Sequence, residues 1–243
     1  GLGFIADKEK ADIDFVYYLL TYFQKQLKHI GEGYVQDNIN LGTFESIDFL
    51  VPSLPEQQAI ASVLSALDDK IDLLQRQNQT LEQMAATLFR QWFIEEAKED
   101  WETYCLKDLA NIYIGRTPPR KESHWFSNSN KDYKWISIKD MADSGTFTIQ
   151  TNEYLSKNTI DSFKIPVIPT NTVILSFKMT VGRVKITLED MVSNEAIAQF
   201  QIKKLISKEF LYCFLKQYNF DTLGSTSSIV TAVNTALIKD IEV

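Results

Sequence analysis

Apolar residues recur in a seven-residue pattern along the stretch from Ser53 to Phe93. Two rows of residues, four positions apart, read as the d and a positions of one heptad register that continues through five heptads without a break. The first row is Ile60, Leu67, Leu74, Leu81 and Leu88, and the second is Leu64, Ile71, Asn78, Ala85 and Trp92. The pattern predicts a long helix with a coiled-coil seam. Its start is a capping-box sequence, in which Glu56 follows Ser53 by three residues.

Asn78 is the polar position in this seam. A buried Asn costs stability but penalises misaligned pairings, since one register alone gives it a hydrogen-bonding partner. Two interpretations remain open: a helix packed along its own domain with Asn78 at a wet edge, or a spacer helix paired with another long helix. We favour the second, because a helix of five heptads is too long to be an ordinary helix of one small domain. The partner helix is expected beyond Val243 or on another chain.

The remaining periodicities are shorter and mixed in type. Helical spacing covers Asp14–Leu27 and Lys208–Tyr218, and Leu106–Ile114 reads as a short helix or a strand. Alternating or β-branched stretches predict strands over Trp135–Ile138, Thr146–Tyr154, Thr172–Phe177, Arg183–Leu188 and Ile197–Ile202. Strands followed by helices without regular alternation predict an α+β fold, a domain of mixed strands and helices joined to the long helix.

The composition is ordinary for a soluble globular protein, which we expect to be cytoplasmic. A chain of 243 residues with 44% apolar residues suits two bodies joined by a rod. The run Phe15–Leu20 is far too short to span a membrane, and the start of the chain lacks the pattern of a signal peptide. Cys105 and Cys213 have no metal-ligand spacing and are expected to be reduced thiols.

Charge is distributed unevenly along the chain. The net charge is −7, but residues 1–100 carry 8 basic and 17 acidic side chains, whereas residues 101–243 carry 17 basic and 15 acidic ones. Between Arg116 and Lys139 basic residues outnumber acidic ones. Local basic density governs phosphate contact more than the total does. The uneven distribution leaves a nucleic-acid partner open.

The two ends of the chain resemble each other. Phe15–Leu20 and Phe210–Leu215 match in apolar character and aromatic placement, and each precedes a glycine, a polar loop with Asn and an apolar stretch with Asp. The first copy passes into the long helix, and the second ends at Val243. We interpret the chain as the tail of one unit, a connecting helix and a nearly complete second unit.

Several motifs add to this repeat. The long helix starts with Pro52–Gln57 and continues into the heptads. Further motif residues in the second unit are Trp101, Leu106, Asp108, Leu109, Gly115, Thr117, Pro118, Trp135–Met141, Ser176, Val181, Gly182 and Ser193–Ala196. With the repeat, these motifs resemble those of the specificity subunit of type I restriction-modification systems. The long-helix start is the most specific match, and the others are looser.

The resemblance implies a division of the chain into three parts. Residues 1–52 would be the C-terminal part of a first target-recognition domain, 53–98 a spacer helix, and 101–243 a second target-recognition domain. The resemblance also implies that the spacer helix pairs with a second long helix running antiparallel. By comparison with the family, the first domain lacks most of its length, and no second long helix follows. We expect a fragment of a longer polypeptide, with a rearranged half-subunit as the alternative.

The resemblance also implies a non-catalytic DNA-reading subunit. It would direct methyltransferase (modification) and restriction subunits to a bipartite target in double-stranded DNA, with S-adenosylmethionine held by the modification subunits and no cofactor or metal of its own. The sequence contains no Gly-rich cofactor fingerprint, no phosphate-binding loop and no Asn/Asp-Pro-Pro-aromatic motif. A protein-binding coiled-coil scaffold without DNA readout is the alternative. A self-contained methyltransferase is disfavoured by the missing catalytic motif.

Side chains that could contact DNA lie on the predicted loops of residues 101–243. Arg and Lys suit guanine or phosphate, and hydroxyl groups suit either. The candidates are Arg116, Thr117, Arg120, Lys121, Lys134, Ser137, Lys139, Lys178, Thr180, Arg183, Ser225, Thr226 and Ser227. The sequence does not separate base readers from phosphate contacts.

Overall fold

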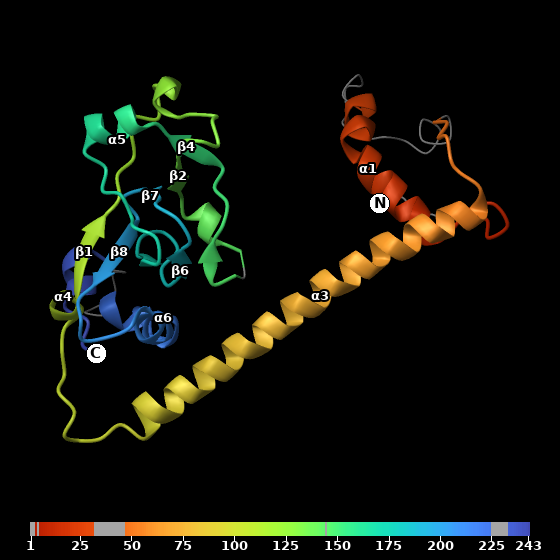
Figure 1. The fold of residues 1–243 in the computed structure, drawn as a ribbon. Coiled ribbons are helices and arrows are strands. Elements are labelled where there is room, and N and C mark those ends of the chain that lie inside the picture. Colours follow the sequence, from red (N-terminus) through yellow and green to blue (C-terminus); the bar gives the residue numbers. More distant parts are fainter. Residues whose placement is uncertain (1–2, 4, 32–46, 144, 225–232) are drawn as a thin grey trace. The chain divides into compact units, whose positions relative to one another are not determined.

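A computed structural model of the chain describes residues 3, 5–31, 47–143, 145–224 and 233–243. The chain divides into two compact units, residues 1–82 and 83–243, and the division falls inside the long helix. That helix, α3 (Leu54–Arg90), has 37 residues and is followed by a π-helical turn, η1 (Gln91–Glu95) (Figure 1). None of the described helices is both long and apolar enough to cross a lipid bilayer.

The first unit joins α1 (Ile13–Gly31) to the beginning of α3. The Asp12 carboxylate accepts hydrogen bonds from the backbone N–H groups of Asp14 and Phe15, which satisfies amides at the start of α1 that have no partner in the helix. Farther along, the Tyr18 hydroxyl donates to Asp68 of α3 at 2.8 Å. Phe15 and Ala61 are the buried apolar side chains of this contact region.

Gln57, the last residue of the Leu-Pro-Glu-Gln start of α3, is buried and ties this unit together. Its Oε1 accepts from the Asp12 N–H at 3.0 Å, and its Nε2 donates to the carbonyls of Lys10 at 3.2 Å and Pro52 at 2.9 Å. One amide side chain thus satisfies three backbone groups from two segments of the chain. The motif has a structural explanation, because a shorter or apolar side chain would leave these groups without partners.

Replacing Gln57 with alanine should destabilise the first unit by about 2–3 kcal/mol, since buried backbone groups would lose their partners. Gln58, its exposed neighbour, supplies the matched control, and its replacement by alanine should change stability by less than about 0.5 kcal/mol. Urea unfolding followed by far-ultraviolet circular dichroism measures both. Equal effects of the two substitutions would contradict the role assigned to Gln57.

The second unit contains two sheets. The larger has the strand order β1-β8-β5-β6-β3, and the smaller has the order β4-β2-β7. All neighbouring strands run antiparallel except the pairs β3/β6 and β2/β7. The strands are β1 (Ala110–Ile114), β2 (Tyr133–Ile136), β3 (Phe147–Thr148), β4 (Glu153–Leu155), β5 (Val173–Ser176), β6 (Val184–Thr187), β7 (Val192–Ser193) and β8 (Ile197–Ile202).

Strand β5 lies at the centre of the core and is buried on both faces. Val173 and Leu175 belong to a cluster that includes residues of α6 (Lys208–Gln217), whereas Ile174 belongs to a second cluster with Ile136. Burial on both faces explains why this strand reads as a continuous apolar run instead of an alternating one. Figure 1 shows α6 beside the strands of the larger sheet, and α6 packs on β5 and β6.

The beginning and end of the second unit pair with each other. The backbone of Tyr104 exchanges two hydrogen bonds with Val243, at 3.1 and 2.8 Å, and the Leu106 N–H donates to the Ile241 carbonyl at 2.9 Å. Three short helices complete the unit: α4 (Leu106–Leu109), α5 (Lys157–Phe163) and α7 (Thr235–Lys239). Single turns of 3-10 helix occur at η2 (Ser123–Trp125), η3 (Lys139–Met141) and η4 (Phe220–Gly224).

The α+β class is confirmed, and the two matched segments both form helices against α3. Phe15 lies in α1, which contacts α3 through Asp68, while Phe210 lies in α6 with its ring 5.2 Å from that of Phe89. The expected helix to Lys98 is shorter, because the charged stretch after Glu95 provides no apolar face. Leu106–Ile114 is a helical turn followed by a strand. The expected strand Thr146–Tyr154 is instead two short strands, each paired with a different sheet.

Candidate nucleic-acid interface

Two loops that the sequence singles out come together at one end of the larger sheet. Strand β1 ends with Ile114 opposite Ala198, and β5 ends with Ser176 opposite Ile197. The Pro loop (Gly115–Lys121) after β1 and the hairpin tip (Phe177–Gly182) after β5 therefore lie at the same end, where β8 begins. We call this the loop end of the sheet.

The β7–β8 segment (Ser193–Ala196) holds these loops together through its backbone. The Ser193 carbonyl accepts from the Arg116 N–H at 2.8 Å, and the Ala196 carbonyl accepts from the Phe177 N–H at 2.9 Å. The Asn194 N–H donates to the Ile136 carbonyl at 3.0 Å, at the end of β2. The loop end thus also includes the η3 segment (Ser137–Met141), which follows β2. The Ser-Asn-Glu-Ala segment is therefore the structural centre of the loop end.

Gly115 is buried where the Pro loop passes over this segment. A Cβ atom at Gly115 would lie 2.2 Å from the Ser193 carbonyl oxygen, 2.3 Å from the Asn194 carbonyl oxygen and 2.3 Å from the Ser193 hydroxyl. Two of these atoms belong to the backbone and cannot rotate away. The close approach therefore requires glycine.

Most polar candidates of the Pro loop are bound to the protein itself. Arg116 donates to the Phe163 carbonyl at 3.0 Å, and the Thr117 hydroxyl hydrogen-bonds to Glu195. Arg120 forms an ion pair with Glu153 at 2.6 Å, and its guanidinium lies 4.3 and 4.6 Å from the ring centroids of Phe126 and Trp135. These contacts fix the loop.

The exposed Lys121 is different. Among the described residues it has no hydrogen-bond or ion-pair partner. It is the cation of the Pro loop that remains available to a ligand.

The candidates around β2 divide in the same way. Lys134 is mostly buried and binds Glu189 and the Ile149 carbonyl. Ser137 donates to the Asp140 carboxylate at 2.6 Å, within the η3 segment. Lys139 is exposed and has no partner in the part of the chain that the structure describes.

At the hairpin tip, Arg183 joins two loops. Its guanidinium donates to the Ile138 carbonyl at 2.7 Å, which fixes the hairpin to the η3 segment. Lys178 and Thr180 are exposed, and the Lys178 ammonium lies 5.4 Å from the centroid of the Phe177 ring. Ser225, Thr226 and Ser227 fall outside the described residues. Lys121, Lys139, Lys178 and the Thr180 hydroxyl therefore remain as the uncommitted candidates at the loop end.

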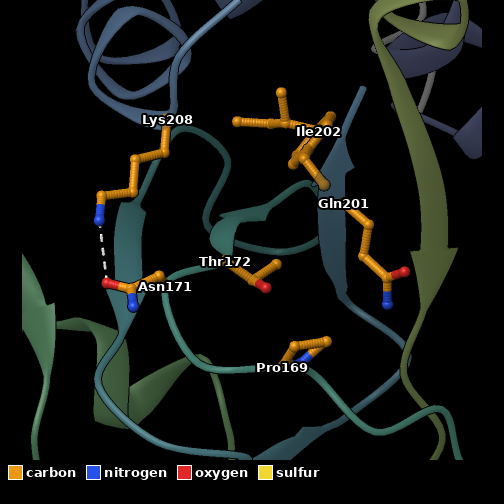
Figure 2. A pocket seen from close by; sticks show the side chains of 7 residues that line it. Pro169, Asn171, Thr172, Gln201, Ile202 and Lys208 are labelled. Atoms are coloured by element: carbon orange, nitrogen blue, oxygen red, sulfur yellow. Dashed lines mark hydrogen bonds between the residues drawn. The ribbon is translucent and has the colours of Figure 1, made fainter. Parts of the chain in front are cut away.

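A shallow hollow of about 370 Å³ lies at the opposite end of the sheet, near the start of β5 and the end of β8. In Figure 2, Lys208 on its wall donates to the Asn171 side-chain oxygen at 2.9 Å. Its lining residues are Pro169, Asn171, Thr172, Phe200, Gln201, Ile202 and Lys208, with no His, Cys or carboxylate among them. The hollow is separate from the loop end and contains no acid–base pair.

A second, larger hollow of about 550 Å³ is lined mainly by apolar side chains. Phe89, Phe93 and Trp101 contribute to it together with Phe210, whose ring lies 5.0 Å from that of Phe93. These rings connect the last turns of α3 to α6 within the second unit. The contact makes the end of the helix part of that unit.

The described residues offer no metal site and no activated thiol. No three His, Cys, Asp or Glu side chains in this part of the chain are placed to hold a metal ion. Burial, followed by the nearby Glu209 carboxylate, raises the pKa of the Cys213 thiol, so little thiolate forms at neutral pH.

The apolar seam of α3 is exposed in this chain. The exposed fractions of Leu67, Leu74 and Leu81 are 58%, 45% and 61%. Ile60, Ile71 and Leu88 are exposed as well, and Leu64 is half-buried. Such a stripe exceeds what soluble monomers usually leave in contact with water. The pairing of this seam with a second helix stays a prediction.

Sequence reasoning missed two residues that the structure brings forward. Gln57 could have been recognised as a buried polar residue from its place in the helix-start motif. Met179, at the hairpin tip, has 94% of its surface exposed and a φ of 61°. The sequence predicts strands on either side of it, Thr172–Phe177 and Arg183–Leu188, but it does not reveal which side chain of the connection points outward.

The chain is similar in sequence to one family of proteins and to two of its curated relatives. The profile of the family described as type I restriction modification DNA specificity domain matches residues 2–83 and 98–243. The MjaIX type I restriction enzyme specificity subunit of Methanocaldococcus jannaschii is 24% identical over 239 residues, covering 89% of this chain and 54% of the relative. The HindI specificity subunit of Haemophilus influenzae is 25% identical over 280 residues, covering 83% and 60%.

A solved structure has a similar fold. The type I restriction-modification S subunit from M. genitalium superposes with a TM-score of 0.59 at 17% identity, over 97% of this chain and 62% of that one. The chain thus spans little more than half the length of the curated relatives described above.

Proposed function

Because this chain belongs to the family of type I restriction modification DNA specificity domains, we propose that it recognises double-stranded DNA by sequence and has no catalytic activity of its own. The names of its relatives support this assignment, since both are specificity subunits of type I restriction enzymes. Methyl transfer and cleavage would then belong to the modification and restriction subunits that bind this chain. S-adenosylmethionine would bind to the modification subunits. The DNA substrate would place this function in the cytoplasm.

The proposal rests on one observation: at the loop end the arginines bind the protein itself, whereas three exposed lysines have no hydrogen-bond or ion-pair partner among the described residues. Arg116, Arg120 and Arg183 fix three loops by binding the protein's own carbonyls and carboxylates. Lys121, Lys139 and Lys178 are exposed on these same loops, without hydrogen-bond or ion-pair partners among the described residues. Rigid loops that present unpaired lysines suit phosphate contact, which positions a protein on a duplex before its base edges are read.

The long helix suits the role of a spacer. Residues 101–243 would form one target-recognition domain, residues 53–98 the spacer, and residues 1–52 the end of another recognition domain. The exposed seam from Ile60 to Leu88 would bind an antiparallel helix, from a continuation of the polypeptide or from another copy. Antiparallel pairing would place two recognition domains at a fixed separation, which fits a bipartite target.

A protein-binding scaffold is the competing function, and the salt dependence of DNA binding separates the two. A DNA-reading subunit that neutralises several phosphates should bind a duplex with an affinity that falls steeply and linearly on a logarithmic salt scale. The probe is a pool of random-sequence duplexes, from which repeated selection should also enrich a bipartite sequence. Enrichment of a defined sequence is expected. Absence of measurable duplex binding at low salt would favour the scaffold.

A further inference from the structure

Met179 occupies the tip of the β5–β6 hairpin in an unusual conformation. Among the described residues of the second unit it is the most exposed large apolar side chain, at 94%. Its φ of 61° lies in the left-handed region, which is uncommon for residues other than glycine. Lys164 and Asn171 share this property, but Lys164 ends α5 and Asn tolerates the region well. Neither explanation applies to Met179.

Hydrogen bonds from a buried serine hold the tip in place. The Ser176 hydroxyl donates to the Thr180 carbonyl at 2.6 Å and accepts from the Arg183 N–H at 3.1 Å. The Thr180 N–H also donates to the Lys178 carbonyl at 2.7 Å, so that Met179 is the central residue of a tight γ-turn. The conformation is therefore fixed before any ligand binds, and strain of this kind is typical of functional positions.

Basic residues lie next to this apolar tip. Lys178 precedes Met179 directly, and Arg183, just before β6, binds the carbonyl of Ile138, the residue before Lys139. The nearby Asp140 carboxylate is engaged by Ser137 and Asn152. An exposed apolar side chain next to basic side chains suits a ligand that is anionic on its outside and apolar inside. A DNA duplex has this chemistry, with stacked bases behind its phosphates.

We propose that Met179 inserts as a wedge against a base step of the bound duplex and partly unstacks it, while Lys139 and Lys178 bind the flanking phosphates. This role rests on the proposed DNA-binding function and adds a mode of readout to it. A wedge gives specificity through the deformability of a base step and needs no hydrogen bond to the base edges. Pyrimidine–purine steps unstack most easily and are the expected position.

The test uses the intact chain and the duplex that it selects from a random pool, with 2-aminopurine in place of each adenine of either strand in turn. The wild type should raise the fluorescence at one step. Met179→Asn keeps a residue that tolerates positive φ but removes the apolar side chain, and should abolish that signal. Met179→Leu should retain it. All three proteins should have the same salt slope, because no charge changes, while preference for the selected duplex falls about tenfold in Met179→Asn.

The outcomes separate the wedge from the proposed function. A wild type that binds no duplex would overturn both. Duplex binding by the wild type with no rise in fluorescence at any step would overturn the wedge and leave DNA recognition intact. A Met179→Asn protein that unstacks DNA normally but fails to bind the modification subunits would assign the tip to a protein interface instead. Thermal melts check the fold: Met179→Leu should melt like the wild type, and Met179→Asn at the same temperature or slightly above it, because Asn tolerates positive φ better.

Discussion

Alanine at position 115 should disrupt the loop end of the sheet and abolish DNA recognition by the second unit. The added Cβ would overlap two backbone carbonyl oxygens, at 2.2 and 2.3 Å, so the Pro loop and the β7–β8 segment would have to separate. Separation breaks the hydrogen bond from Arg116 to Ser193 and displaces Lys121. We expect a loss of about 3 kcal/mol in stability, the upper end for overpacking by a small group.

Gly145 provides the matched control for this substitution. A Cβ at Gly145 would meet its nearest atom at 3.9 Å, and its φ lies outside the left-handed region. Gly145→Ala should therefore change stability by less than about 0.5 kcal/mol. Urea unfolding and binding to the selected duplex measure both variants. Normal stability of Gly115→Ala would mean that the close approach does not exist in solution.

Simultaneous replacement of Leu67, Leu74 and Leu81 by alanine should abolish pairing of the long helix. These side chains lie outside the second unit and are exposed in this chain. The stability of the second unit should therefore not change. In a paired rod they would be buried, and each replacement would cost about 2–5 kcal/mol of the pairing free energy. Helix melting followed by circular dichroism at several protein concentrations measures the effect. If the melting midpoint of the wild type depends on protein concentration, the partner helix lies on another copy of the chain.

Leu73 serves as the control for the seam. It has 48% of its surface exposed, close to the 45% of Leu74, but it occupies position c of the heptad instead of d. Leu73→Ala should leave the melting midpoint within a few degrees of wild type. A triple variant of this chain that melts like wild type would exclude pairing with another copy, and equal melting of the full-length polypeptide would show that the seam has no helical partner.

Strong periodicity made parts of the fold predictable from sequence. The heptads of α3, the apolar run of β5 and the helix after Ser207 each follow from local patterns, and the structure places all three close to their predicted bounds. Two short helices were missed. Their capping residues were the available signal: Ser156 accepts from Thr159 at 3.3 Å, and Asn234 accepts from Leu237 at 3.0 Å. Short elements carry too few residues for periodicity to decide.

The sequence could not predict which candidate side chains bind the protein itself and which remain free for a ligand. The sequence placed Thr117 and Arg183 on loops, but their partners, Glu195 and the Ile138 carbonyl, are 78 and 45 residues away. A loop position with a basic or hydroxyl side chain looks the same in sequence whether it binds a ligand or the protein itself. Strand pairing decides whether such a side chain binds the protein itself, because the strand register brings its distant partner to the same end of the sheet.

The most direct test of DNA recognition at the loop end is the salt slope of duplex binding after removal of its free cations. Lys121→Gln, Lys139→Gln and Lys178→Gln should each lower the slope by about one, and their combination by about three. Lys204, an exposed lysine at the other end of β8, is the control, and Lys204→Gln should leave the slope unchanged. A triple variant whose slope and affinity equal those of wild type would contradict DNA binding at this surface.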